Sequence, residues 1–218
     1  MREALAPVIA VIALAAAAPL AAQPRATQKQ ADALSIRAEG FFAGQWFTAA
    51  DSFDATMGTS FGPFYGGGFM LAERGYFLDV GISHFSKTGQ RVFVSNGQAY
   101  PLNIPLTVSV TPVEFTFGYR FRRRHALMPY FGGGVGSYGY KETSQGAESG
   151  DDVDVHHAGY LAVGGAEFRF HKWVGVAADV QYTHIPGVLG EAGVSKEFGE
   201  SDLGGTAFHI KVLVGTGR

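Results

Sequence analysis

The chain has 218 residues, a formal net charge of −2, no cysteine, and high contents of glycine (31 residues) and phenylalanine (18 residues). The lack of cysteine excludes a disulfide framework and a thiolate zinc site, and the slightly acidic balance argues against general attraction to nucleic acid. The length suits one domain of β-barrel size.

The first predicted element is a secretion leader. Residues 4–20 are almost entirely Ala, Val, Ile, Leu and Pro, and Leu20-Ala21-Ala22-Gln23 offers small residues for cleavage. A membrane anchor is the alternative, but the apolar run is short for a span of about 20 residues and no basic cluster follows it. We therefore predict a cleavable signal peptide at 1–22, a flexible arm at 23–34 and one domain at 35–218.

Eight segments of that domain alternate between apolar and polar residues. The clearest is 107–122, where Phe115 and Phe117 alternate with Glu114 and Thr116. Because successive side chains of a strand point to opposite faces, each segment has one apolar and one polar face. The predicted strands are 35–47, 60–72, 76–85, 107–122, 129–141, 156–170, 173–185 and 206–215.

The predicted links between these strands alternate in length. The short links are 73–75, 123–128 and 171–172. The long links are 48–59, 86–106, 142–155 and 186–205. Outer-membrane barrels have short periplasmic turns and longer external loops, whereas a soluble meander has no reason to sort its links.

The polar faces carry nearly balanced charges. With about eight strands, the interior of a barrel has room only for side chains, and a buried charge without a partner is costly. We therefore expect a lumen filled by ion pairs and not an open pore. The inward residues of this predicted network are Arg37, Glu39, Asp79, Glu114, Arg120, Glu167, Arg169, Asp179, His209 and Lys211.

A soluble periplasmic barrel or sandwich would show the same alternation, with Phe115, Val180 and Ile210 in its core. The leader, the sorted links and the aromatic residues at strand ends favour the membrane. Those aromatic residues are Trp46, Tyr76, Phe121, Phe170, Trp173 and Tyr182. The predicted fold class is all-β: a closed, antiparallel, up-and-down transmembrane β-barrel of about eight strands.

Two segments carry a family resemblance, PYFGGGVG at 129–136 and VAADVQY at 176–182. With the leader and the strand count, they make residues 35–215 resemble the bacterial outer-membrane β-barrel domain family, small eight-stranded barrels similar to the OmpA transmembrane domain. The resemblance implies the outer membrane, contact with its lipid and lipopolysaccharide, and insertion by the barrel-assembly machinery. Family members commonly end on an aromatic residue that this machinery reads. This sequence ends VLVGTGR, so we expect either an internal signal around Phe208 or a different signal.

Two patterns are candidates for chemistry. His156-His157 follows an acidic run and could bind a metal, but adjacent strand residues point to opposite faces. His184, Ser195 and Glu200 could form the Ser-His-acid site of a lipid-modifying hydrolase at the outer rim, although no recognisable motif surrounds the serine. We therefore predict no catalytic, cofactor or metal site.

The sequence favours an integral barrel with a structural or surface-interaction role. The alternatives are a narrow pore or conduit for small or apolar solutes, a lipid-modifying hydrolase at the rim and a soluble binding barrel. Residues 186–205, rich in glycine and acids, are the best candidate for an external binding surface. The sequence does not identify an external ligand.

Overall fold

The computed structural model describes residues 34–95, 97–121, 126–144, 153–191 and 193–215. The predicted leader and all but the last residue of the predicted arm lie outside the described residues.

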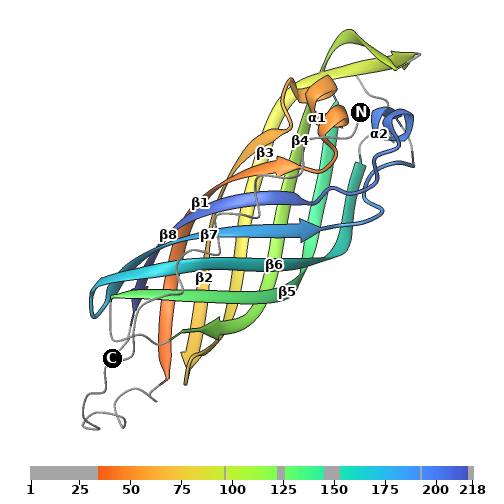
Figure 1. The fold of residues 1–218 in the computed structure, drawn as a ribbon. Coiled ribbons are helices and arrows are strands. Elements are labelled where there is room, and N and C mark those ends of the chain that lie inside the picture. The colour runs from red at the N-terminus through yellow and green to blue at the C-terminus, as the bar shows by residue number, and fades with distance from the viewer. Residues whose placement is uncertain (1–33, 96, 122–125, 145–152, 192, 216–218) are drawn as a thin grey trace, which may run out of the picture.

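Eight antiparallel strands close into one up-and-down barrel, in which each strand pairs with its neighbours in the chain and β1 pairs with β8 (Figure 1). This confirms the predicted fold class. The strands are β1 (Ser35–Phe47), β2 (Phe61–Glu73), β3 (Tyr76–Ser95), β4 (Gln98–Arg120), β5 (Leu127–Ser144), β6 (Val153–His171), β7 (Val174–His184) and β8 (Gly205–Gly215).

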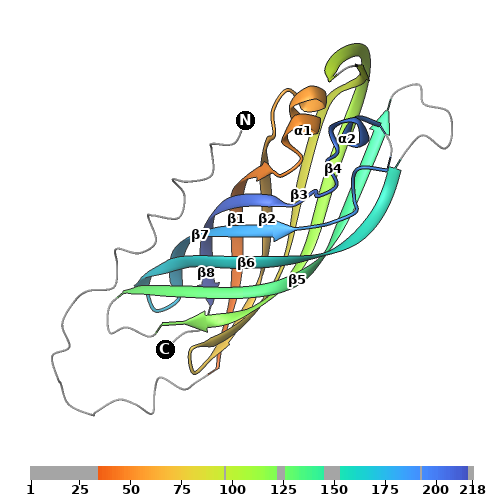
Figure 2. The same cartoon turned by 45° about the vertical axis from the view of Figure 1, so that its right-hand side comes forward.

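The two ends of the barrel differ. The links β2–β3, β4–β5 and β6–β7 lie at one end, here called the turn end. Two short helices, α1 (Ala50–Met57) and α2 (Gly193–Phe198), lie together at the opposite end, here called the helix end (Figure 2). No helix in the described part of the chain is long and apolar enough to cross a membrane.

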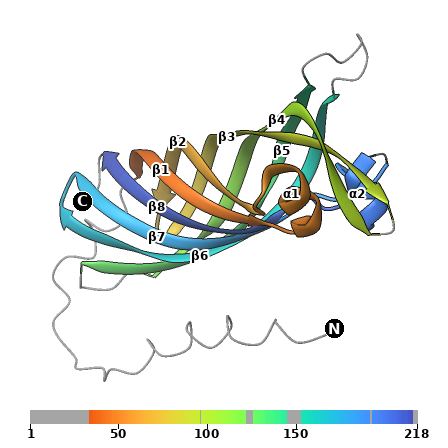
Figure 3. The same cartoon turned by 90° about the horizontal axis from the view of Figure 1, so that it is seen from above.

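The prediction of a long loop at 86–106 is wrong. β3 and β4 remain paired as far as Ser95 and Gln98, and their hairpin projects past neighbouring strands at the helix end (Figures 1 and 3). The reason is local chemistry: Asn96-Gly97 is a strong two-residue hairpin signal, and the φ of +75° at Gly97 suits glycine. The β-branched and aromatic residues on both sides, such as Val92, support extended strands.

The apolar faces of the strands point out of the barrel. Phe115, Val180 and Ile210 are 49%, 41% and 56% exposed, while their neighbours Asp179 and His209 are buried inside. The soluble alternative, which placed these three apolar residues in a core, is therefore contradicted. The six aromatic residues predicted at strand ends are all exposed on the outer surface.

The interior contains two separate apolar clusters. The larger lies towards the helix end and includes residues of α1, and the smaller lies towards the turn end and includes Met70, Phe77 and Leu213. The polar residues of the inward faces lie mainly beside the smaller cluster and between the two. The barrel is therefore filled by side chains along its length.

Candidate functional site

Glu167 of β6 is the centre of the ionic cluster nearest the turn end. The residue is 1% exposed, and its carboxylate forms ion pairs with Arg37 of β1 and Arg120 of β4. The Nε atom of Arg169 lies 3.3 Å from Oε1 of the same carboxylate. Charge-assisted bonds of this kind are the strong ones. One side chain thus links three strands that are distant in sequence.

Asp179 of β7 is the centre of a second cluster. Tyr130 donates a hydrogen bond of 2.5 Å to Oδ2, and Nδ1 of His209 lies 2.8 Å from Oδ1. Nζ of Lys211 lies 3.3 Å from Asp179 and 3.5 Å from Glu39, so this lysine joins two acids. The same ammonium lies 5.6 Å from the centroid of the Phe41 ring, within range of a cation–π interaction.

The inward charges are close to balance but are not fully paired. Among the described residues, Oε2 of Glu39, Oδ1 of Asp79 and Nε of Arg120 are buried without a hydrogen-bond partner. The ten residues of the predicted network comprise five acids, four permanent cations and His209, which adds a fifth cation when it is protonated.

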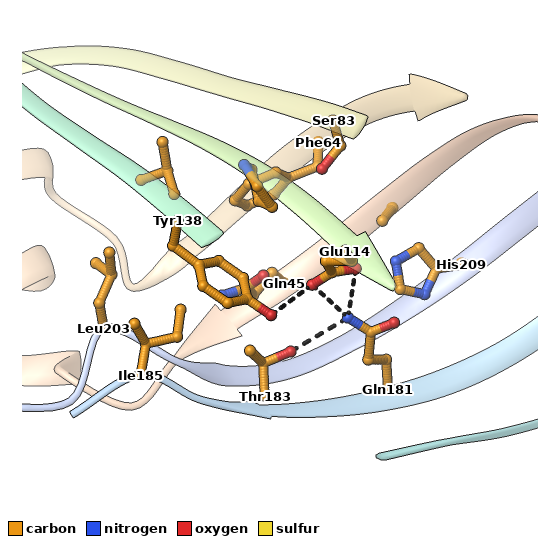
Figure 4. Close-up of a pocket in the computed structure, with 13 residues that line it drawn as sticks. Gln45, Phe64, Ser83, Glu114, Tyr138, Gln181, Thr183, Ile185, Leu203 and His209 are labelled. Carbon is orange, nitrogen blue, oxygen red and sulfur yellow. Dashed lines mark hydrogen bonds between the residues drawn. The ribbon is translucent and has the colours of Figure 1, made fainter. Parts of the chain in front are cut away.

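Glu114 of β4 borders a small cavity that His209 of the second cluster also lines (Figure 4). Tyr138 donates to its Oε1 at 2.8 Å, and Nε2 of Gln181 donates to its two oxygens at 3.0 and 3.1 Å. Gln181 also contacts Oγ1 of Thr183 at 3.2 Å. A cavity of about 20 Å³ adjoins these residues, enough for about one water molecule. Neutral donors, rather than a cation, thus provide the hydrogen bonds to this acid.

Above Glu114, aromatic rings fill the barrel towards the helix end. Phe47, Phe53, Phe64 and Phe85 form what we call the aromatic plug. The Phe47 and Phe53 rings stack with centroids 4.0 Å apart, and Phe64 and Phe85 stack at 5.2 Å. Phe53 belongs to α1, so this helix inserts a ring into the mouth of the barrel.

Sequence reasoning missed the plug and the neutral members of the polar network. Tyr130 and Tyr138 lie on β5, whose facing was ambiguous in the sequence, and α1 lies in a segment predicted only as a loop. Two features of the sequence could have indicated these residues. Phe47 shares the inward phase of its predicted strand with Gln45, and Gln181 shares the inward phase of its strand with Asp179.

The three candidates for a rim hydrolase have separate partners. Nδ1 of His184 lies 2.8 Å from Asp202, and Oγ of Ser195 accepts a hydrogen bond from a backbone N–H at 2.9 Å. The carboxylate of Glu200 accepts from the backbone N–H groups of Asp51 and Ser52 at 3.0 and 2.8 Å. The acid beside the histidine is thus Asp202, and Glu200 holds the first turn of α1.

The two histidines proposed for a metal site are consecutive residues of β6, opposite Gly139 and Tyr138 of β5. No group of three His, Cys, Asp or Glu residues suited to a metal ion occurs in the part of the chain that the structure describes.

Comparison with known families decides what kind of barrel this is. The family model for the outer membrane protein beta-barrel domain matches residues 8–214. The chain belongs to this family. The barrel is therefore an outer-membrane protein, with its turn end in the periplasm and its helix end outside the cell.

Solved structures share the architecture. Neisserial surface protein A is 11% identical, with 83% of this chain and 96% of that chain covered and a TM-score of 0.52. The outer membrane protein OprG from Pseudomonas aeruginosa is 12% identical, with 87% and 98% covered and a TM-score of 0.53. At these identities the likeness establishes the fold alone. No curated protein matches the chain in sequence.

Proposed function

We propose that this family member is a closed, non-enzymatic barrel that acts through the surface at its helix end, and that it is not a conduit. One observation carries this proposal: the cavity that Glu114, Tyr138 and Gln181 line, between the ionic clusters and the aromatic plug, has a volume of about 20 Å³. A hydrated ion needs a continuous path of water, and a space for about one water molecule does not supply it.

The lumen contains two barriers of different chemistry. Towards the turn end, Glu167 of β6 binds Arg37 of β1 and Arg120 of β4 across the lumen, and Asp179 of β7 binds Lys211 of the neighbouring strand β8. Moving either acid would leave buried charges unpaired. Towards the helix end, the aromatic plug offers no polar group to an ion. We propose that the ten inward charged residues are structural: they hold the strands together and close the lumen.

Single-channel recording tests the closed lumen. Purified protein in planar bilayers should give no unitary currents, while a porin in the same bilayers gives regular steps. Steady unitary currents from the folded barrel would contradict the proposal and favour the narrow pore. The matched control is Phe121→Ala, which removes an exposed ring on the outer surface and should also leave the bilayer silent.

The domain organisation and the partners complete the proposal. We propose that residues 1–22 are removed as a leader, that residues 23–34 precede the barrel as an arm, and that residues 35–218 form the barrel domain. The exposed aromatic residues, including Trp46 and Trp173, suit the interfaces of the membrane, and the outer leaflet there presents lipopolysaccharide. Insertion by the barrel-assembly machinery would use a signal around Phe208, which is exposed on β8.

A further inference from the structure

Asp79 of β3 is a buried acid that has no ion pair with any residue the structure describes. Its side chain lies on the inner face of the barrel, and its partners in the strand register are Met70 of β2 and Thr116 of β4. The residue is 8% exposed, and its Oδ1 has no hydrogen-bond partner in the described part of the chain. An ionised carboxylate that loses water without compensation is costly, so buried ones are normally paired. The charge state of Asp79 therefore needs an explanation.

Other acids of the lumen have donors that stabilise their ionised forms. Glu167 contacts three arginines. Asp179 contacts a tyrosine, a histidine and a lysine. Glu114 accepts hydrogen bonds from a tyrosine and a glutamine. Oδ1 of Asp79 differs from all of them, because no described donor reaches it.

The charged groups that act on Asp79 are mostly acids. They are Glu39 of β1, Glu114 of β4, Asp179 of β7 and, as the one cation, Lys211 of β8. That lysine already has two acids as partners, since its Nζ lies 3.3 Å from Asp179 and 3.5 Å from Glu39. An ionised Asp79 would thus add a fourth negative charge around a single ammonium group.

The other titratable groups on the surrounding inner faces have partners of their own. Tyr130 of β5 and His209 of β8 both bind Asp179. Arg37 of β1 and Arg120 of β4 pair with Glu167. The neighbouring strand β2 places an uncharged methionine opposite Asp79. Among the described residues, no cation is therefore left to balance an Asp79 carboxylate.

We propose that Asp79 is a proton-binding site, which the folded barrel holds as the neutral carboxylic acid. A protonated carboxyl group needs no counter-charge and can donate a hydrogen bond. Oε2 of Glu39 is an acceptor for it, because this oxygen is also buried without a partner among the described residues. The two acids share the inner face of strands that only β2 separates, and Gly68, opposite Glu39, puts no side chain between them. One proton thus accounts for both unpaired oxygens.

The proton links the stability of the barrel to pH. An aspartate of an unfolded chain loses its proton near about pH 4. The folded barrel keeps the proton of Asp79 above that pH, so the folded state binds one proton more than the unfolded state. This stabilising contribution is present at acid pH and is lost as the pH rises.

Infrared spectroscopy of the full-length mature protein tests the proton directly. In alkyl maltoside micelles, which contain no carbonyl group, a protonated carboxylic acid gives a carbonyl stretching band apart from the amide and carboxylate bands. At about pH 6, exposed Asp and Glu side chains are ionised. We expect one such band in the folded wild-type barrel, shifted in D₂O, and no such band in Asp79→Asn. No band in the wild type, or the same band in Asp79→Asn, would overturn the proposal.

Two further variants test the assigned acceptor. Glu39→Gln removes the negative charge beside Asp79 but keeps an acceptor oxygen, so the band should remain and shift in frequency. Glu114→Gln is the matched control, because its carboxylate already accepts hydrogen bonds from Tyr138 and Gln181 and the band should keep its frequency. An unshifted band in Glu39→Gln would contradict the hydrogen bond to Glu39.

Urea titrations in lipid vesicles give a second readout. The unfolding equilibrium constant of the wild type, divided by that of Asp79→Asn, should rise by up to about tenfold per pH unit above about pH 5, since only the wild type loses a proton at this site. A ratio that does not change with pH would contradict the proposal. Asparagine is neutral and has the same shape as the protonated acid, so the variant should fold. Failure to fold would show that the barrel needs the charged form.

Discussion

At the scale of single residues, the lumen depends on Glu167 more than on any other acid in the described barrel. Its carboxylate has three arginine partners, and two of them, Arg37 and Arg120, are themselves buried. Water does not solvate the charge of a guanidinium group in that position. One acid therefore neutralises several buried cations, and its removal breaks more than one ion pair.

Glu167→Gln keeps the shape of the side chain and removes its charge. We expect the free energy of unfolding, measured by urea titration in lipid vesicles, to fall by about 3–5 kcal/mol, because buried arginines lose their counter-charge. The matched control is Glu73→Gln, which breaks an exposed pair with Arg74 at 3.7 Å and should cost less than about 1 kcal/mol. Equal, small losses in both variants would show that the buried cluster does not stabilise the barrel.

At the scale of elements, α1 depends on a distant loop for its position. Its N-cap residue, Ala49, supplies no side-chain hydrogen bond, and the carboxylate of Glu200 takes over that role for Asp51 and Ser52. An acid at a helix N-terminus also interacts favourably with the helix dipole. The external segment before β8 therefore holds the helix that closes the barrel.

Glu200→Ala should release the first turn of α1 without opening the barrel. We expect hydrogen exchange at the amides of Asp51 and Ser52 to accelerate by a factor that corresponds to about 0.5–2 kcal/mol, the usual cost of a lost cap. Glu197→Ala, at an exposed position in α2, is the control and should leave both amides unchanged. Protection that survives in Glu200→Ala would mean that packing of Phe53 alone holds the helix.

At the scale of the whole molecule, the sequence predicted the features that the membrane imposes on the spanning strands. It missed features that lie outside that constraint. Lipid outside and a narrow lumen inside force alternation on every spanning strand, so Phe115 and Glu114 could be assigned to opposite faces. The β3–β4 extension lies beyond that constraint, where polar Ser86, Thr88 and Gln90 replace apolar residues on the outward face. The signals for it were the Asn96-Gly97 turn and the β-branched and aromatic residues beside it.

The interior sites were likewise predicted in part. The phase of each strand identified the inward charges, but partners such as Arg37 and Glu167 are 130 residues apart, and their meeting depends on the stagger of the closed barrel. The aromatic plug depends on α1 docking against a loop that is almost 150 residues away in the chain. Local sequence patterns do not predict that contact.

The central claim is that lipid surrounds this barrel and that its lumen is closed to water. Two adjacent alanines of β7 test it together: Ala177 is buried in the lumen, and Ala178 faces outward. Because the chain has no cysteine, Ala177→Cys and Ala178→Cys each introduce a single thiol.

In bilayers, a spin label on Cys at 178 should collide with oxygen and not with a water-soluble nickel complex. The thiol at 177 should resist a charged methanethiosulfonate until the protein is unfolded. Rapid reaction at 177 in the folded protein, or preferential contact of the label at 178 with nickel, would contradict the account.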